Sequence, residues 1–290
     1  MVLTVNAEEL LRPGLLADGG FAERPGGLFR PDVTAWGILA LAGREDGDNG
    51  RETAARAGDR LARAQQPDGS VPLAADHLAA VWPTSLALLA WQAVDGQPEA
   101  RRRAVEFLLG LEGTHADHER SPESGHDSSL IGWPWTTGTH SWVEPTVLAL
   151  LSLRRAGRAS HPRVEEGGRL LLDRQLSRGG WNYGNTTVFG TELEAQPDAT
   201  GAALTALAGT AASARVERSL SLLERILPGV NTPVSLAWSL VGLGRWGRRP
   251  PEAHELIGGC LDSESRYGGY GTTAKAMLLI ARDGGGAFGG

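Results

Sequence analysis

The sequence is poor in cysteine, in basic charge and in long apolar runs, and each scarcity excludes a class of protein. Cys260 is the only cysteine among 290 residues, so the chain has no intrachain disulfide and no cysteine-rich zinc site. No apolar run approaches the roughly 20 residues that a membrane-spanning helix needs. Basic side chains number 28 against 34 acidic ones, a net charge of −6, which argues against nucleic acid or an anionic membrane surface as the main partner.

The start of the chain also lacks the pattern of a secretory signal. Residues Met1 to Ala17 include Glu8 and Glu9 and show no basic region followed by an apolar one. With no membrane segment expected either, these features predict a cytoplasmic protein.

One phrase recurs six times and decides the predicted fold. In each copy a turn leads to Pro or Thr and then to an Ala- and Leu-rich helix. These helices are apolar nearly all round, which is typical of buried helices. The phrases are PDVTAWGILALA from Pro31, VWPTSLALLAW from Val81, VEPTVLALLSL from Val143, QPDATGAALTAL from Gln196, TPVSLAWSLVGL from Thr232 and GTTAKAMLLIA from Gly271.

Amphipathic helices are expected between the apolar ones, with apolar residues at helical spacing and Arg or Glu on the other side. This alternation predicts two layers, an inner and an outer helix in each hairpin. An open solenoid would need polar capping repeats, but Thr273–Ala281 is as apolar as the middle repeats, which favours closure. The expected outer helices are Glu52–Gln65, Glu99–Leu111, Val164–Leu176 and Ala214–Leu227.

We therefore predict one all-α domain spanning residues 1–290, a closed barrel of about six inner and outer helices. Pro supplies the helical φ at the start of an inner helix, and Thr or Asp nearby can cap its free amide groups. Because the inner helices run parallel, their starts should share one rim. The aligned positions are Asp32, Trp82, Glu144, Asp198, Thr232 and Gly271.

Gly- and aromatic-rich turns after the outer helices carry a family resemblance. The turns are AQQPDGSVP from Ala64, RQLSRGGWNYG from Arg174 and SESRYGGYGTT from Ser263. Gln followed by Gly-Gly-Trp resembles the repeated Gln…Trp motif of squalene-type terpene cyclases. With the inner-helix phrases, it makes nearly the whole chain similar to the α/α toroid family that these cyclases share with protein prenyltransferase β subunits. The resemblance implies an α/α toroid, a fold that hosts several functions.

The two branches of this family place different demands on the residues. Prenyltransferases hold zinc through Asp, Cys and His, but no histidine follows Cys260, so neither that branch nor its zinc is expected. Class II terpene cyclases carry Asp-x-Asp-Asp at an inner-helix start. In the matching stretch Gln196–Gly201 only the middle aspartate, the family's proton donor, is kept, as Asp198. Gln196 and Ala199 replace its partners, and no Asp-rich diphosphate–magnesium motif is present.

Three rim positions carry carboxylates: Asp32, Glu144 and Asp198. Like charges in a partly desolvated cavity raise at least one pKa, which leaves a protonated acid near neutral pH. Such an acid could protonate an alkene or an epoxide. The alternative interpretation is that all three residues cap their helices, since a helix N-terminus favours the anion.

Nine tryptophans, against five Phe and three Tyr, are a second signal. Aromatic faces stabilise cations, which suits a carbocation intermediate or an ammonium ligand. Packing is the alternative, above all for the tryptophan of the Gln…Trp motif. His140, four residues before Glu144, could orient a carboxylate, act as a base or simply lie in a surface turn. The candidate substrate-binding residues are Trp36, Trp82, His140, Trp142, Trp181, Tyr183 and Trp238.

Two loops complete the set of candidate features. His115, Asp117 and His118, with His126 and Asp127 later, could be drawn as a metal site, but their polar surroundings predict a solvated loop and no metal. Residues Trp181–Glu194 form a polar loop that could cover the rim as a lid.

The sequence therefore favours an enzyme that cyclises or isomerises a hydrophobic isoprenoid by acid initiation. Asp198 would donate the proton, Glu144 and Asp32 would tune it, and no cofactor is implied. Two alternatives stay open. One is a glycan-active α/α barrel with paired acid/base carboxylates and tryptophans stacked on sugars. The other is a non-catalytic toroid that binds a lipid or a partner protein. An apolar cavity favours the first or third function, and a polar cleft favours the second.

Overall fold

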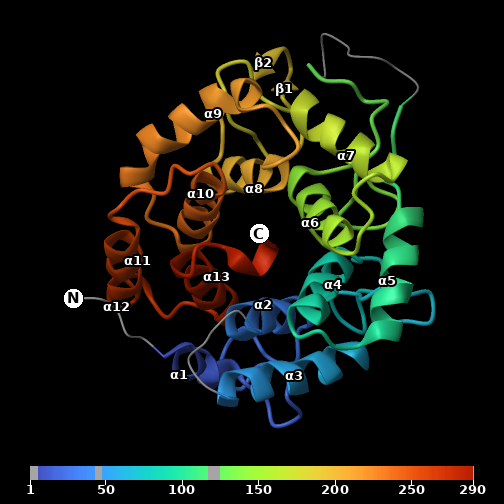
Figure 1. Cartoon of the computed structure of the whole chain (residues 1–290), viewed down its shortest axis with the longest axis vertical. Helices are drawn as coiled ribbons and strands as arrows, with labels where there is room; N and C mark the ends of the chain where they lie inside the picture. Colours follow the sequence, from blue (N-terminus) through green and yellow to red (C-terminus); the bar gives the residue numbers. More distant parts are fainter. Residues whose placement is uncertain (1–5, 43–47, 117–124, 290) are drawn as a thin grey trace. The chain divides into compact units, whose positions relative to one another are not determined.

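The computed structural model describes residues 6–42, 48–116 and 125–289, in which the predicted all-α class is confirmed (Figure 1). The only strands in this described part are β1 (Thr187–Val188) and β2 (Thr191–Glu192), which pair antiparallel as one hairpin. The chain divides into two compact units, Met1–Gly110 with His254–Gly290 and Leu111–Ala253. None of the described helices is long and apolar enough to cross a membrane.

The first unit packs its apolar helices around α2, which contacts α3, α4 and α13. Helix α2 is buried from Pro31 to Leu41, as expected of an inner helix. The unit also has short 3₁₀ turns at Arg12–Gly14 and Gly286–Phe288. Its helices are α1 (Ala7–Leu11), α2 (Pro31–Ala42), α3 (Asp48–Ala62), α4 (Pro83–Ala93), α5 (Pro98–Gly110), α11 (Ala253–Asp262), α12 (Glu264–Tyr267) and α13 (Thr272–Arg282). The first residue of α11, Ala253, belongs to the second unit.

The second unit has the same two kinds of helix. Helix α8 packs against α6 and α10 (Figure 1). It is buried along most of its length, whereas α7 and α9 bury only one side. A 3₁₀ turn, Leu227–Gly229, follows α9. The helices of this unit are α6 (Val143–Arg155), α7 (Pro162–Asp173), α8 (Pro197–Leu207), α9 (Ser213–Ile226) and α10 (Pro233–Arg245).

The outer helices α3 and α7 end about one turn earlier than the sequence predicts, because the glutamine of each turn has another partner. Gln65 Nε2 donates to the carbonyl of Ala100 in α5, at 2.9 Å. Gln175 Nε2 donates to Ser219 Oγ in α9, at 2.7 Å. Each of these two glutamines therefore ties one outer helix to the next.

The threonines of the inner-helix phrases do not cap their helices, contrary to our expectation. Helices α4, α6, α8, α10 and α13 have no side-chain cap. Instead, the threonine hydroxyl accepts a backbone N–H from the preceding turn. The distances from the backbone N to the threonine Oγ1 are 2.9 Å for Phe21 and Thr34, 2.8 Å for Val71 and Thr84, 3.1 Å for Trp133 and Thr146, and 3.0 Å for Trp181 and Thr200.

Helices α8 and α10 are in backbone contact at two glycines. A Cβ atom on Gly201 would lie 2.2 Å from the Trp238 carbonyl oxygen, and one on Gly242 would lie 2.5 Å from the Gly201 oxygen. No residue with a side chain fits at either position without moving a helix. This contact fixes the first turn of α8, which carries Asp198.

Candidate functional site

The second unit brings two of the three predicted rim carboxylates together. Glu144 lies in the first turn of α6 and Asp198 in the first turn of α8, and these helices pack against each other. Tyr183 connects the two starts. Its backbone carbonyl accepts the Val143 N–H at 2.8 Å, and its hydroxyl donates a long hydrogen bond of 3.5 Å to Asp198 Oδ2.

Glu144 has the environment of a neutral acid. Its side chain is half-buried and has no hydrogen bond or ion pair to any described residue. Burial, and secondly the negative charge of Asp198, raise its pKa to about 7. At neutral pH a substantial fraction of Glu144 therefore carries a proton, and the helix-cap interpretation does not describe it.

Asp32, in the first unit, has a different environment. Its carboxylate is buried and accepts two hydrogen bonds from the Arg30 guanidinium, at 2.9 Å from Nε and 2.7 Å from NH2. Such a bidentate pair provides two charge-assisted hydrogen bonds, which are shorter and stronger than neutral ones. Asp32 thus has a guanidinium partner next to its own helix start, which Glu144 lacks.

Two of the predicted aromatic residues lie beside Glu144. Trp142 precedes α6 and is half-buried, and its ring centroid is 4.5 Å from that of His140. Tyr183 is 47% exposed, so its ring is accessible. Burial, and secondly the charge of Arg174, lower the pKa of His140. Near neutral pH, His140 is therefore mostly the neutral imidazole.

The other predicted tryptophans pack differently. Trp181 and Trp238 are almost completely buried, and Trp181 Nε1 donates to the Leu171 carbonyl at 2.6 Å. Trp36 is buried in the first unit, where its ring meets that of Phe288 edge-on. Trp82 is half-buried before α4. We assign a packing role to Trp181 and Trp238 and leave them out of the proposed site.

A polar cavity of about 380 Å³ opens next to His140. Arg174, which the sequence analysis did not single out, is its buried cationic wall, with 6% of the residue exposed. Helical spacing offered a signal for it, because Arg174 follows the buried Leu170 and Leu171 by four and three residues on the apolar side of α7. The polar residues lining this cavity include Thr114, His115, His126, His140, Arg174 and Asn185.

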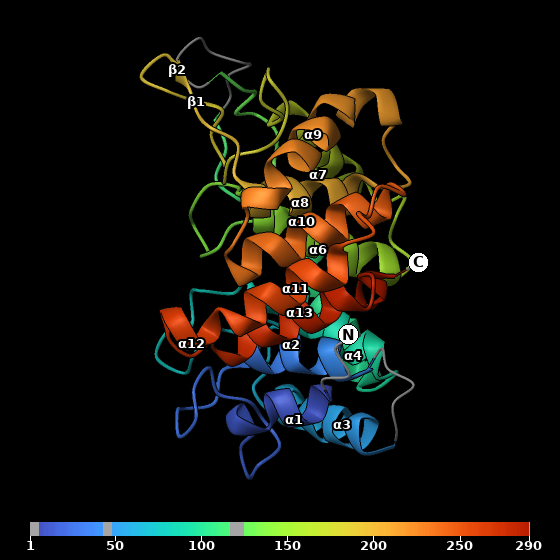
Figure 2. The same ribbon diagram turned by 90° about the vertical axis from the view of Figure 1, so that its left-hand side faces the viewer.

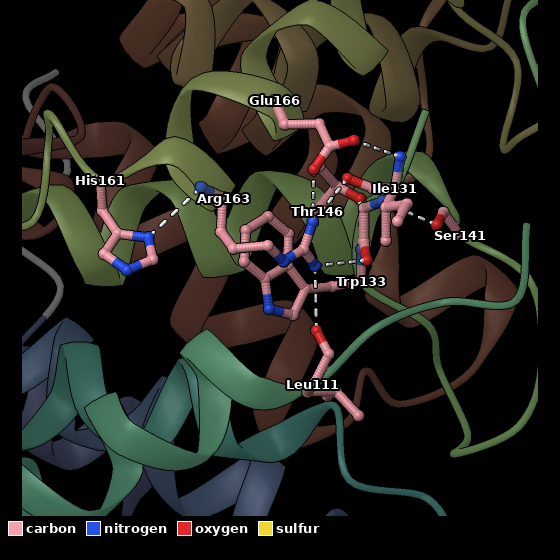
Figure 3. A network of polar contacts seen from close by, with 9 residues as sticks. Leu111, Ile131, Trp133, Ser141, Thr146, His161, Arg163 and Glu166 are labelled. Carbon is pink, nitrogen blue, oxygen red and sulfur yellow. Dashed lines mark hydrogen bonds and ion pairs between the residues drawn. The ribbon is translucent and has the colours of Figure 1, made fainter. Parts of the chain in front are cut away.

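Arg163 holds the segment around Ile131, which leads to the cavity residue His140 (Figure 3). Its guanidinium donates to the carbonyls of Ile131 at 2.9 Å and Leu111 at 3.0 Å, and it pairs with Glu166 at 3.1 Å. It also lies over the ring of Trp133, 4.7 Å from the centroid. The segment that leads to His140 is therefore attached to α7 at several points.

The structure offers no metal centre in the residues it describes, where no three His, Cys, Asp or Glu side chains gather as ligands. Asp117 and His118 of the predicted histidine loop lie outside the described residues. The predicted lid segment Trp181–Glu194 contains the β1–β2 hairpin, which projects away from the helices of its unit (Figure 2). Phe189 at its tip is fully exposed.

Sequence comparisons find no relatives, whereas structural comparisons find many. No protein-family model matches the chain, and no curated protein matches it significantly. An inactive variant of the GH76A α-1,6-mannanase from Salegentibacter, in complex with α-1,6-mannotriose, is similar with a TM-score of 0.67 and 10% identity, over 96% of each chain.

Two further solved structures cover nearly the whole chain. A variant of the type II terpene cyclase MstE from Scytonema, in complex with its substrate geranylgeranyl dihydroxybenzoate, has a TM-score of 0.64 and 16% identity over 96% of this chain and 95% of its own. A protein from Actinoplanes has a TM-score of 0.60 and 15% identity over 96% of this chain and 99% of its own. At such low identities the likeness shows the fold alone, and the predicted α/α toroid fold is confirmed.

Proposed function

We propose that this chain is an isoprenoid-handling enzyme that uses the Glu144–Asp198 pair as a general acid to start a cyclisation or isomerisation. The observation that carries the proposal is the placement of Glu144, a half-buried acid near Asp198 with no hydrogen bond among the described residues, which raises its pKa to about 7. The likeness of Gln196–Gly201 to the class II cyclase motif and the structural similarity to MstE support the isoprenoid class.

The proposed reaction begins with the proton on Glu144. A general acid works best when its pKa lies near the working pH, and this one does. With an epoxide substrate, the Glu144 O–H bond breaks as the proton moves to the epoxide oxygen, and a C–O bond opens to leave a hydroxyl group, a carbon cation and the Glu144 carboxylate. After ring closure the cation loses a C–H proton to form an alkene, and the carboxylate pair takes up this proton, so that the acid is restored and the product keeps the mass of the substrate. Such a moderate acid suits an epoxide or a polarised alkene better than an isolated alkene. The rings of Trp142 and Tyr183 would then face the carbon cation.

This proposal assigns the two carboxylates differently from the family resemblance, which makes Asp198 the donor. Asp198 is half-buried and keeps a hydrogen bond to Tyr183, whereas Glu144 has none. We therefore place the proton on Glu144 and the negative charge on Asp198, whose role is to raise the pKa of its neighbour. Because the groups are coupled, the proton belongs to the pair, with Glu144 as its main site.

Glycan hydrolysis is the second candidate, and the polar cavity beside His140 favours it. A raised acid next to an ionised carboxylate is also the arrangement of glycosidases. However, the inactive variant of the similar mannanase has two consecutive aspartates replaced, and this sequence contains no two consecutive aspartates. For this reason we rank the glycan function second.

The test is turnover of two substrate panels, prenyl epoxides with prenyl alkenes and α-1,6-mannooligosaccharides, with products analysed by mass spectrometry. We expect isoprenoid products that keep the mass of the substrate, and a rate that falls as the pH rises through about 7, because Glu144 loses its proton there. Glu144→Gln should lower the rate by about 10²- to 10⁴-fold.

Two further variants assign the roles. Asp198→Asn removes the charge that helps raise the pKa of Glu144, so its pH–rate profile should move to lower pH. Glu165→Gln, an exposed glutamate of α7, is the matched control and should match wild type. An inactive Asp198→Asn beside an active Glu144→Gln would return the donor role to Asp198, and hydrolysis of the mannooligosaccharides alone would establish the second candidate.

A further inference from the structure

The polar cavity of the second unit has a chemical bias of its own. It measures about 380 Å³, and among the described residues its lining contains three histidines and one arginine but no carboxylate: His115, His126, His140 and Arg174. His126 and Arg174 are at least nine-tenths buried, whereas His115, His140 and Asn185 reach solvent. The cavity is thus open at one side and has a buried, positively charged wall.

Arg174 uses little of its hydrogen-bonding capacity. Its NH1 group donates to the Gly184 carbonyl at 2.8 Å, and its buried Nε has no acceptor among the described residues. A guanidinium has five N–H donors in a planar fork that matches an oxyanion. Leaving such donors unsatisfied in a buried place is costly, so an acceptor from outside the chain would be favoured.

The neighbouring aspartates do not neutralise this charge by contact. Asp173 Oδ2 accepts the Asp127 N–H at 2.8 Å, and Asp127 Oδ1 accepts the backbone N–H and the hydroxyl of Ser129. Arg174 forms no ion pair with any described residue. Burial accordingly lowers the pKa of Arg174 to about 10, although Asp173 and Asp127 act in the opposite direction. At neutral pH it remains a cation in a partly desolvated site.

We propose that this cavity is a binding site for an oxyanion, a carboxylate or a phosphate group, held by the guanidinium of Arg174 with the histidines and Asn185 around it. The site does not depend on the proposed catalytic function, since it needs no chemistry at Glu144. The anion would meet the free N–H donors of Arg174 in charge-assisted hydrogen bonds.

The experiment measures binding of inorganic phosphate and of acetate to the full chain by isothermal titration calorimetry, with thermal unfolding as a second readout. Saturable binding of one or both anions is expected, and the stronger anion identifies the class of ligand. Asn185→Asp adds a negative charge at the exposed mouth of the cavity without disturbing buried packing. It should weaken binding about tenfold, because a like charge a few Å away costs about 1.4 kcal/mol.

Controls separate the cavity from general charge effects. Asn231→Asp makes the same change at an exposed residue outside the cavity and should leave binding within about twofold. Arg174→Lys keeps the charge but loses the fork and should also weaken binding. Arg154→Lys, at a half-buried arginine whose NH1 contacts the Ala206 carbonyl, should not. Absence of saturable binding, or equal losses in Asn185→Asp and Asn231→Asp, would overturn the proposal whatever the outcome of the turnover assays.

Discussion

The two units share the same sequence phrase at their inner-helix starts, but the carboxylates of this phrase have different partners in each unit. In the first unit, Asp32 is held by a bidentate ion pair with Arg30. In the second, Glu144 and Asp198 lie close enough for one charge to raise the pKa of the other, and neither has an ion pair to a described residue. The phrase therefore builds structure in both units, and in the second unit, where no arginine accompanies it, its carboxylates have no ion pair to a described residue.

The units also differ in what the glycines of their inner helices contact. Gly37 of α2 lies under the ring of Phe21, and a Cβ atom there would be 3.0 Å from that ring. Gly201 of α8 lies against the backbone of α10, where a Cβ atom would be 2.2 Å from a carbonyl oxygen. A ring can shift by a few tenths of an ångström, but a helix backbone cannot do so without moving its neighbours. We expect the second unit to be the less tolerant of larger residues.

The largest predicted effect tests this difference. Gly201→Ala should lower the free energy of unfolding by about 3 kcal/mol, because the added methyl group forces α8 and α10 apart. Urea denaturation followed by circular dichroism measures it. Gly37→Ala is the matched change and should be nearly neutral, since the better helix propensity of Ala, worth about 1 kcal/mol, offsets the crowding of Phe21. Equal losses in the two variants would remove the distinction between the units.

The next effect concerns the unpaired acid. The pKa of Glu144 is raised in the folded state to about 7, so its ionisation destabilises the fold increasingly above its unfolded pKa, up to about pH 7. Glu144→Gln removes this penalty. The variant should be more stable than wild type by roughly 2 kcal/mol at pH 8, and the difference should vanish near pH 4. Thermal or urea unfolding across this pH range provides the measurement.

Asp32→Asn sharpens the same comparison, because its effect should have the opposite sign. The change breaks a bidentate pair and leaves the Arg30 guanidinium facing an amide. Arg30 is partly exposed, so the expected loss of stability is only about 1 kcal/mol at neutral pH. If Glu144→Gln and Asp32→Asn destabilise the protein equally at pH 8, both carboxylates serve the fold and the acid role of Glu144 is wrong.

The fold could be predicted from the sequence because the patterns that indicate its helices are local and repeated. The apolar phrases from Pro31, Val143 and Gln196 and the amphipathic segments between them determine which helices are buried, whatever their partners. The arrangement of Glu144 and Asp198 could be predicted from the sequence only in part. Glu144 and Asp198 could be aligned as rim positions, but the ion pair of Asp32 depends on the rotamer of Arg30. Arg174 was missed because its role comes from a cavity formed by loops far from it in sequence.

Loss of the hydrogen bond between a backbone N–H and an inner-helix threonine should lower the free energy of unfolding equally in both units, since this bond is structural in each. Thr34→Val and Thr200→Val keep the side-chain shape and leave the buried N–H groups of Phe21 and Trp181 without their acceptors. Each should lose roughly 1 to 2 kcal/mol in urea denaturation. Thr210→Val, an exposed threonine after α8, is the control and should change stability little. A much larger loss at Thr200 than at Thr34 would mean that the tie has a second role beside Asp198.

The smallest predicted change in stability comes from substituting an exposed apolar residue in each unit. Phe189 has a positive φ of 51° and is followed by Gly190 at 76°, a pair of conformations in which a hairpin favours Asn-Gly. Its side chain is fully exposed, so no packing offsets the backbone strain. Phe189→Asn should therefore raise stability by about 0.5 kcal/mol. In the first unit, Leu28 is 88% exposed but its φ is not positive, so Leu28→Asn should leave stability unchanged. A destabilised Phe189→Asn would show that the ring packs on the fold after all. If Phe189→Asn is more stable than wild type but turns over less substrate, the Phe189 ring contacts a ligand. A residue whose strained backbone lowers stability does not serve folding, so another function would then account for it.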